Sequence, residues 1–137
     1  MPIPIPVPDE LDKPFFDAAK QHKLVIQYCT RDNLWQFPPR ATCNKCRQAD
    51  KLEWRETSGR GKILTYCQSN DTRVVALKSD MPYNIAVITL EEDEGIQFYS
   101  HLPGVALDEV PMGRRVKVTW QDVGEGMVIP EWEYLQP

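Results

Sequence analysis

At residues 37–46 the chain reads Phe37-Pro38-Pro39-Arg40-Ala41-Thr42-Cys43-Asn44-Lys45-Cys46. Two thiolates separated by two residues can hold one Zn²⁺ from a single tight turn, and a tetrahedral site then needs two more ligands. Upstream, the segment Cys29-Thr-Arg-Asp32 offers a third sulfur and, at the position of a second paired cysteine, a carboxylate. Carboxylate oxygen also binds zinc, so the spacing predicts a structural Cys₃Asp site that is weaker and more acid-sensitive than a Cys₄ site. The predicted ligands are Cys29, Asp32, Cys43 and Cys46.

Two alternatives to this site stay open. The ribbon could lack metal and keep its shape through the packing of apolar side chains, namely Tyr28, Leu34, Trp35 and Phe37. His22 is an alternative fourth ligand, although it also suits the end of a helix. The remaining cysteine, Cys67, falls in a predicted strand, where we expect it in the core as a small apolar residue.

The segment that precedes the cysteines predicts an arm and a helix. Residues 2–8 alternate proline with aliphatic residues, which excludes a helix or a central strand because every second residue lacks an N–H. We expect an extended arm there. Asp9 is a candidate N-cap for a short amphipathic helix over about residues 10–22, with Pro14 tolerated in its first turns.

From residue 24 onward the pattern is typical of short β-strands separated by turn residues. Residues 24–53 indicate short strands joined by tight loops around the cysteines. The strands expected in this region and beyond it are residues 24–28, 34–37, 51–57, 62–69, 84–90, 96–102 and 115–120. From residue 51 onward, five or six closely spaced strands in under ninety residues predict a small barrel.

The composition is that of an ordinary globular chain, with 137 residues of which 42% are apolar and 26% charged. This length suffices for one domain, or for a small core with an appended module. No apolar run approaches the ~18 residues that span a bilayer, and the N-terminus lacks the features of a secretory signal. We therefore expect a cytoplasmic protein without a membrane partner, in which the cysteines bind metal or are buried.

Charge is segregated along the chain. Residues 40–62 carry seven basic and three acidic side chains, a net charge of +4, whereas residues 80–137 have a net charge of −8. The basic segment could meet a phosphate-bearing ligand through its cationic side chains, although a solvated basic surface explains it equally well. The candidate cations are Arg40, Arg55, Arg60 and Lys62.

A series of motifs over nearly the whole chain resembles the DUF35 family of acyl-CoA-associated proteins. Each motif is short, and the order and spacing of the motifs together carry the resemblance. The matching segments are Phe15-Phe16, Lys23-Leu-Val-Ile-Gln-Tyr-Cys29, Phe37-Pro-Pro-Arg40, Cys43-x-x-Cys46, Leu52-Glu-Trp54, Ser58-Gly-Arg-Gly-Lys62, Pro82-Tyr83 before residues 85–90, Glu94-Gly95, Met112-Gly113 before Val116, and Ile129-Pro130.

This resemblance implies a mainly β fold with an N-terminal helix, a rubredoxin-like zinc ribbon and a C-terminal OB-fold barrel. The corresponding segments are residues 1–23 for the arm and helix, residues 24–53 for the ribbon and residues 54–137 for the OB-fold. The family's ribbon ligands fall on Cys29, Cys43 and Cys46, while Asp32 stands at its second cysteine. Each pair of ligands, Cys29 with Asp32 and Cys43 with Cys46, lies in a tight turn called a knuckle. In the family a glycine usually follows each knuckle, and here Asn33 and Arg47 stand at these positions.

The resemblance also implies binding of CoA thioesters and assembly with thiolase-like or hydratase-like proteins that supply the nucleophile. The sequence shows no G-x-S-x-G motif, and only His22 and His101 are available as histidine bases. We therefore expect a non-catalytic accessory subunit of a hetero-oligomer whose thiolase-like partner performs acyl transfer, thiolysis or retro-aldol chemistry. Candidate CoA contacts are Arg40, Arg60 and Lys62 for the phosphates, with Tyr83 and Trp120 on the barrel wall near the acyl chain.

The alternative function from another class is binding of single-stranded nucleic acid, because aromatic faces of OB-folds stack bases and zinc ribbons often accompany them. Charge disfavours this alternative, since a C-terminal half with a net charge of −8 would repel a phosphate backbone. An independent hydrolase or hydratase is disfavoured because no acid–base pair stands out in the sequence.

Overall fold

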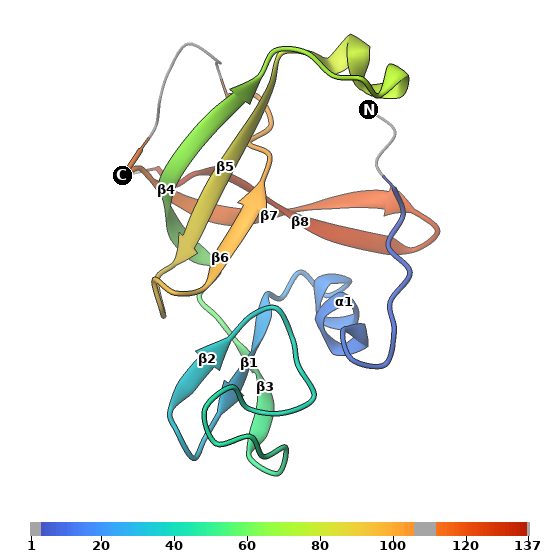
Figure 1. The fold of residues 1–137 in the computed structure, drawn as a ribbon. Helices are drawn as coiled ribbons and strands as arrows, with labels where there is room; N and C mark the ends of the chain where they lie inside the picture. Colours follow the sequence, from blue (N-terminus) through green and yellow to red (C-terminus); the bar gives the residue numbers. More distant parts are fainter. Residues whose placement is uncertain (1–3, 106–111, 137) are drawn as a thin grey trace.

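The computed structural model describes residues 4–105 and 112–136, and it consists mainly of β-strands (Figure 1). A short helix, α1, precedes a three-stranded antiparallel sheet and a five-stranded antiparallel sheet that curls into a nearly closed barrel. The predicted fold of helix, ribbon and OB-fold barrel is confirmed. Within the described residues, no helix is long and apolar enough to cross a bilayer.

Antiparallel pairing orders the strands of both sheets. The ribbon sheet has the order β2-β1-β3 and the barrel sheet the order β6-β5-β4-β7-β8, so that β6 and β8 are its edges. A 3₁₀-helix, η1, lies between β4 and β5. The bounds are α1 Lys13–Ala19, β1 Val25–Cys29, β2 Leu34–Gln36, β3 Leu52–Glu56, β4 Arg60–Ser69, η1 Val75–Asp80, β5 Tyr83–Leu90, β6 Gln97–Ser100, β7 Arg115–Gly124 and β8 Met127–Tyr134.

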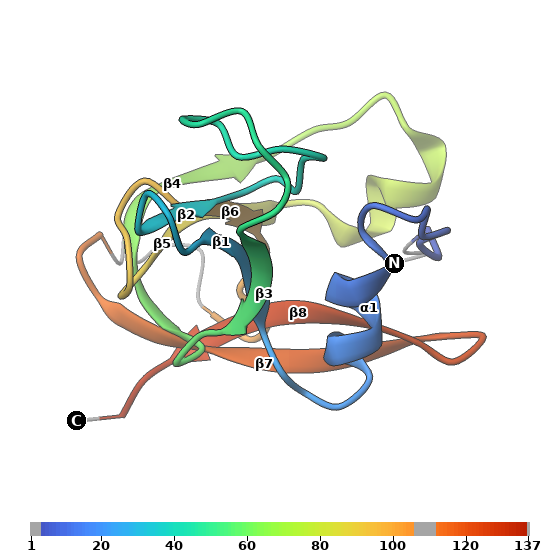
Figure 2. The ribbon, with the colours of Figure 1, turned by 90° about the horizontal axis from the view of Figure 1, so that it is seen from below.

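The helix is shorter than the predicted span of residues 10–22. The Asp9 carboxylate accepts hydrogen bonds from the N–H groups of Leu11 and Asp12 at 2.8 and 3.0 Å, so it caps a turn ahead of the helix. Asp12 takes the N-cap position and Pro14 follows in the first turn, where its missing N–H costs nothing. The seven-residue helix buries Phe15. It contacts β1 and β8. The view from below shows the helix beside the hairpin of β7 and β8 (Figure 2).

The last strand, β8, was absent from the sequence-based prediction, and β7 continues beyond residue 120 to pair with it. The reason is Pro130, which argues against a central strand because it has no N–H to donate. Pro130 lies opposite Trp120 on an edge strand, where one side of the backbone needs no partner. Between β7 and β8, Glu125 turns the chain with a positive φ of 55°.

Cys67 is exposed, contrary to the prediction that it lies in the core. The cause is a register shift in β4 between Ile63 and Thr65, where the pairing with β5 slips by one residue. Because side chains alternate between the two faces of a strand, this bulge exchanges the faces beyond it. Tyr66 then packs against the core, and Cys67 points outward.

One hydrophobic core joins the helix, the ribbon and the barrel. The Phe37 ring lies 6.1 Å from Phe15 of α1 and 4.5 Å from Phe98 of β6, and the Phe98 ring lies 5.9 Å from Trp132 of β8. These centroid separations fall in the range of favourable aromatic pairs. The buried members of this cluster are Phe15, Leu24, Ile26, Ile63, Ala86, Ile88, Leu90, Ile96, Phe98, Leu102, Val116 and Trp132.

Two glycines, Gly59 and Gly61, lie where the chain passes from β3 of the ribbon into β4 of the barrel. Gly59 has a positive φ of 72°, which a glycine adopts without strain. Gly61 lies buried in β4 between Leu90 of β5 and Val116 of β7, so it sits where three strands meet. A Cβ at Gly61 would collide with the Thr89 carbonyl oxygen. The glycines of the segment from residue 58 to 62 therefore serve a turn and a close approach of two strands.

We predict that Gly61→Ala destabilises the protein by about 2 kcal/mol, because backbone atoms of β5 would have to move. Gly95→Ala is the matched control, since the nearest atom to its new Cβ, a carboxylate oxygen of Asp93, lies 3.1 Å away, compared with 2.2 Å at Gly61. Urea unfolding of both variants measures the difference. Equal stability of the two variants would contradict the close packing at Gly61.

Candidate functional site

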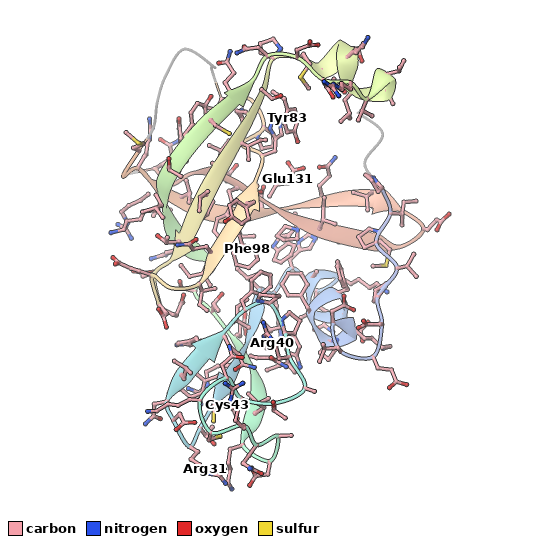
Figure 3. All side chains as sticks on the ribbon, in the orientation of Figure 1. Arg31, Arg40, Cys43, Tyr83, Phe98 and Glu131 are labelled. Carbon is pink, nitrogen blue, oxygen red and sulfur yellow. The ribbon has the colours of Figure 1, made fainter. Side chains whose placement is uncertain are left out.

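Four side chains of the ribbon converge at the end of the module away from the barrel (Figure 3). Cys29 closes β1, Asp32 lies in the turn before β2, and Cys43 and Cys46 lie in the loop before β3. Their ligand atoms, three sulfurs and one carboxylate oxygen, all lie within 4.8 Å of one another. The structure thus brings together the four residues that the sequence predicts as metal ligands.

The Asp32 carboxylate is central to this cluster. Its Oδ2 atom lies 3.3 Å from the Cys43 sulfur and 3.6 Å from the Cys29 sulfur, while the sulfurs of Cys29 and Cys46 are 4.0 Å apart. Cys29 and Cys43 are fully buried, and Asp32 and Cys46 are half-buried. Four donors from two turns around one point are the arrangement that a tetrahedral Zn²⁺ site requires.

The electrostatics of the cluster prepare Asp32 to act as an anionic ligand. Hydrogen bonds donated by the thiols of Cys46 and Cys43 lower the pKa of the Asp32 carboxyl. Burial opposes ionisation of Cys43, but the N–H groups of Cys46 and Lys45 outweigh it and lower the pKa of this thiol. At Cys46 the N–H of Gln48 favours the thiolate, yet burial and the neighbouring carboxylate and thiols raise its pKa. The surroundings of Cys46 therefore oppose its ionisation, which zinc binding requires.

Cations surround the cluster and offset its negative charge. Arg31 places Nη1 3.9 Å from the Cys46 sulfur and pairs with Asp50 at 2.9 Å, which holds its guanidinium in place. The Lys45 ammonium lies 4.0 Å from the Asp32 carboxylate. A centre of three thiolates, one carboxylate and Zn²⁺ carries a net charge of −2, and these cations reduce the cost of holding it. The sequence analysis missed Arg31, although its place inside Cys29-x-x-Asp32 was a usable signal.

The backbone of both knuckles has the conformation that glycine would favour. Asn33 and Arg47, at the usual glycine positions, have positive φ values of 52° and 63°. The Arg47 N–H donates to the Cys43 carbonyl oxygen at 3.0 Å, which closes the second knuckle. Asparagine adopts this region readily, whereas arginine does so at a cost. The replacement of glycine thus leaves the shape of both knuckles intact.

Two buried glutamines hold the loop that carries Cys43. Gln36 donates to the Gln27 side-chain oxygen at 2.9 Å, and its own oxygen accepts the Asn44 N–H at 2.9 Å. Gln27 in turn bonds both the N–H and the carbonyl oxygen of Arg40, at 2.8 and 2.9 Å. Buried amides are stable only when paired, so this network fixes residues 40–44 relative to β1 and β2.

His22 and Trp120 pack against each other outside the metal cluster. Their rings stack with centroids 5.8 Å apart and an interplanar angle of 10°. Among residues 4–105 and 112–136, the group of possible ligands consists of Cys29, Asp32, Cys43 and Cys46 and does not include His22, the alternative fourth ligand. Trp120 packs against the common core of ribbon and barrel.

The five predicted CoA contacts are dispersed over the molecule. Arg60 and Lys62 line a depression of about 220 Å³ on the barrel together with Arg115. Their neighbours are acidic, since Lys62 pairs with Glu94 at 3.1 Å. Arg40 is exposed on the ribbon and Tyr83 lines a pocket on the barrel, at separate places in Figure 3. The residues predicted together therefore do not form one compact pocket.

Comparisons with known proteins place this geometry in a family. Residues 16–53 match the family model of the ChsH2 rubredoxin-like zinc ribbon domain, and residues 54–121 match that of the ChsH2 C-terminal OB-fold domain. A DUF35 domain-containing scaffold protein of Methanocaldococcus jannaschii is 30% identical over 106 residues, which cover 77% of this chain and 73% of that protein. The chain belongs to the DUF35 family. The two family models match the ribbon and most of the barrel of this chain.

Two further relatives match this chain to different extents. A DUF35 domain-containing scaffold protein of Methanothermobacter thermautotrophicus is 34% identical over 65% of both chains. A protein of Thermomonospora curvata named "Probable enoyl-CoA hydratase alpha subunit" is 29% identical over 90% of this chain, which spans 37% of that protein.

Two solved structures share the fold. The Ltp2-ChsH2(DUF35) aldolase contains a chain that superposes with a TM-score of 0.81 and 27% identity, over 94% of this chain and 98% of that one. A DUF35 protein from Sulfolobus solfataricus superposes with a TM-score of 0.60 at 17% identity, over 91% and 85% of the two chains, and shows the fold alone.

We predict that Asp32→Asn lowers zinc affinity roughly tenfold or more, because an amide replaces the anionic ligand at the centre of the cluster. Asp32→Cys restores the fourth thiolate and raises the affinity above that of the wild type. Competition with a chromogenic chelator measures both changes, and Asp71→Asn, an exposed carboxylate of the barrel, serves as the control. Unchanged affinity in Asp32→Asn would remove Asp32 from the ligand set.

Proposed function

We propose that this chain is an accessory subunit of an acyl-CoA-handling enzyme complex and that a thiolase-like or hydratase-like partner performs the chemistry. The observation that carries the proposal is the match to a chain of the Ltp2-ChsH2(DUF35) aldolase, over 98% of that chain at a TM-score of 0.81. The name of the Thermomonospora relative, a hydratase subunit, and the word scaffold in the names of two others support the same role.

The cluster of the ribbon is proposed to hold a structural Zn²⁺ ion. The donor set supports this, since three sulfurs and one carboxylate oxygen fill all four positions of a tetrahedral ion and leave none for a substrate. When bound, the ion ties the turn after β1 to the loop before β3. Because the ribbon is small, this cross-link contributes to its stability and not to a reaction.

Arg60 and Lys62 are proposed to contact the phosphates of a CoA thioester, with Arg115 as a third cation in the same depression. Lys62 is paired with Glu94 and Arg115 lies 3.9 Å from Glu91, so an incoming phosphate would compete with exposed carboxylates. Exposed pairs of this kind contribute little stability and exchange readily. The other predicted contacts, Arg40, Tyr83 and Trp120, lie outside this depression, so they are not part of the proposed phosphate site.

The partner is tested by gentle affinity isolation of the protein from its native host, followed by mass spectrometry of co-purifying proteins and elemental analysis for zinc. We expect a thiolase-like or hydratase-like protein in stoichiometric amount, together with one zinc ion per chain. A protein that emerges alone, or with nucleic acid, would contradict the proposal. Zinc-free protein in an intact complex would favour the metal-free ribbon.

The CoA site is tested by the double charge reversal Arg60→Glu and Lys62→Glu. We expect about tenfold weaker binding of acetyl-CoA, because two attractive contacts with phosphate become repulsive. Isothermal titration at low salt measures the affinity, and Lys20→Glu with Lys78→Glu, two exposed cations outside the depression, is the matched control. Equal losses in both double variants would indicate a general charge effect instead of a site.

A further inference from the structure

A hollow of about 460 Å³, lined in part by Tyr83, lies at the seam of the barrel. The seam separates the two edge strands, β6 and β8, which end the strand order of the sheet. Tyr83 enters the hollow from β5 and Glu131 from β8, both in the upper half of Figure 3. His101 follows β6 directly and Gln121 comes from β7. A volume of this size is typical of sites for small molecules.

Glu131 is the unusual member of this seam pocket. Its exposed fraction is only 9%, and no hydrogen bond or ion pair joins its carboxylate to any residue among those the structure describes. Burial raises the pKa of Glu131, and the electrostatic influence of the His101 ring partly counteracts this. A buried carboxylate without a partner is costly and is retained where something else satisfies it. It therefore points to a ligand.

The opposite wall of the pocket is a rigid aromatic surface. The rings of Tyr83 and His101 stack with centroids 4.1 Å apart and an interplanar angle of 12°. Nδ1 of His101 lies 3.1 Å from the Asn84 carbonyl oxygen, so Nδ1 donates, and in the neutral ring Nε2 is left as the acceptor. The Asn84 side chain bonds both backbone groups of Leu102, at 2.8 and 3.0 Å, which fixes the segment that carries His101.

The charge of the pocket selects the class of ligand. Two carboxylates, Asp80 and Glu131, line it, and its described lining includes neither lysine nor arginine. Burial, together with the nearby carboxylates of Glu131 and Asp80, raises the pKa of Tyr83. Phosphates and carboxylates would be repelled here, in contrast to the depression around Arg60 and Lys62. A positive charge would be attracted.

We propose that the seam pocket binds a small molecule that carries a cationic nitrogen, an ammonium or guanidinium group, which pairs with Glu131 while its apolar or planar part rests on the Tyr83–His101 stack. The buried carboxylate of Glu131 would form a charge-assisted hydrogen bond with the cation. The aromatic rings would bind it through cation–π contacts and would stack with a planar group. The site is distinct from the zinc ribbon and from the proposed CoA depression. Its existence does not depend on the accessory role proposed above.

The test uses the isolated, zinc-loaded chain and four probes of similar size: n-butylammonium, n-butylguanidinium, n-butanol and butyrate. Binding is followed by NMR through the ring signals of His101 and Tyr83. We expect saturable shifts with the two cations, and affinities about tenfold or more lower for the alcohol and for butyrate. Equal affinity for the cations and the alcohol would overturn the proposal, as would an absence of shifts with every probe.

Glu131→Gln removes the charge with little change in shape, and it should weaken binding of the two cations about tenfold or more. Glu133→Gln is the matched control, because Glu133 lies on the same strand and pairs with Lys117 on the exposed surface. Unchanged cation binding in Glu131→Gln, or an equal loss in both variants, would refute the site.

A measurement on the wild-type chain keeps the test independent of how well the Glu131→Gln variant folds. A cation that pairs with Glu131 must lower the pKa of its carboxyl, because it stabilises the ionised form. Titration of the ¹³C-labelled glutamate side chains with and without n-butylammonium detects this shift. We expect a decrease of at least about half a unit at Glu131 and none at Glu133. An unchanged pKa at Glu131 would exclude the pairing.

Discussion

The packing of Phe37 between Phe15 and Phe98 is the contact on which the rest of the structure depends. The ribbon sheet has three short strands and contributes only a few residues to the buried core, among them Leu24 and Ile26. Helix α1 has seven residues, too few to be stable in isolation. Neither element buries enough apolar surface by itself, so both rely on the barrel. Because the helix and the ribbon each bury too little apolar surface alone, they share one core with the barrel.

The shared core also separates the polar sites. It occupies the junction of ribbon and barrel, which leaves the metal cluster at the far end of the ribbon and the seam pocket on the barrel (Figure 3). Cationic groups of Arg31 and Lys45 surround the cluster, whereas carboxylates line the seam pocket. Each site thus has its own electrostatic environment. The two ends of the molecule therefore differ in the charge that they present.

The sequence determined the metal cluster because its ligands are set by short-range spacing. Cys43-x-x-Cys46 and Cys29-x-x-Asp32 each form one tight turn, and two such turns on neighbouring strands meet without help from distant contacts. Alternating apolar residues and turn signals likewise predicted most strands, and the order of motifs predicted the family. The left-handed backbone at Asn33 and Arg47 follows from the same local geometry.

Only the tertiary structure decided the features that depend on which strands pair. The bulge after Ile63 turned Cys67 outward, and the edge position of β8 made room for Pro130, because both effects arise from pairing partners that local sequence does not specify. The predicted CoA contacts share charge or aromatic character but lie on separate surfaces for the same reason. Glu131 stood out only once β8 was folded against His101, since burial without a partner is a property of the assembled barrel.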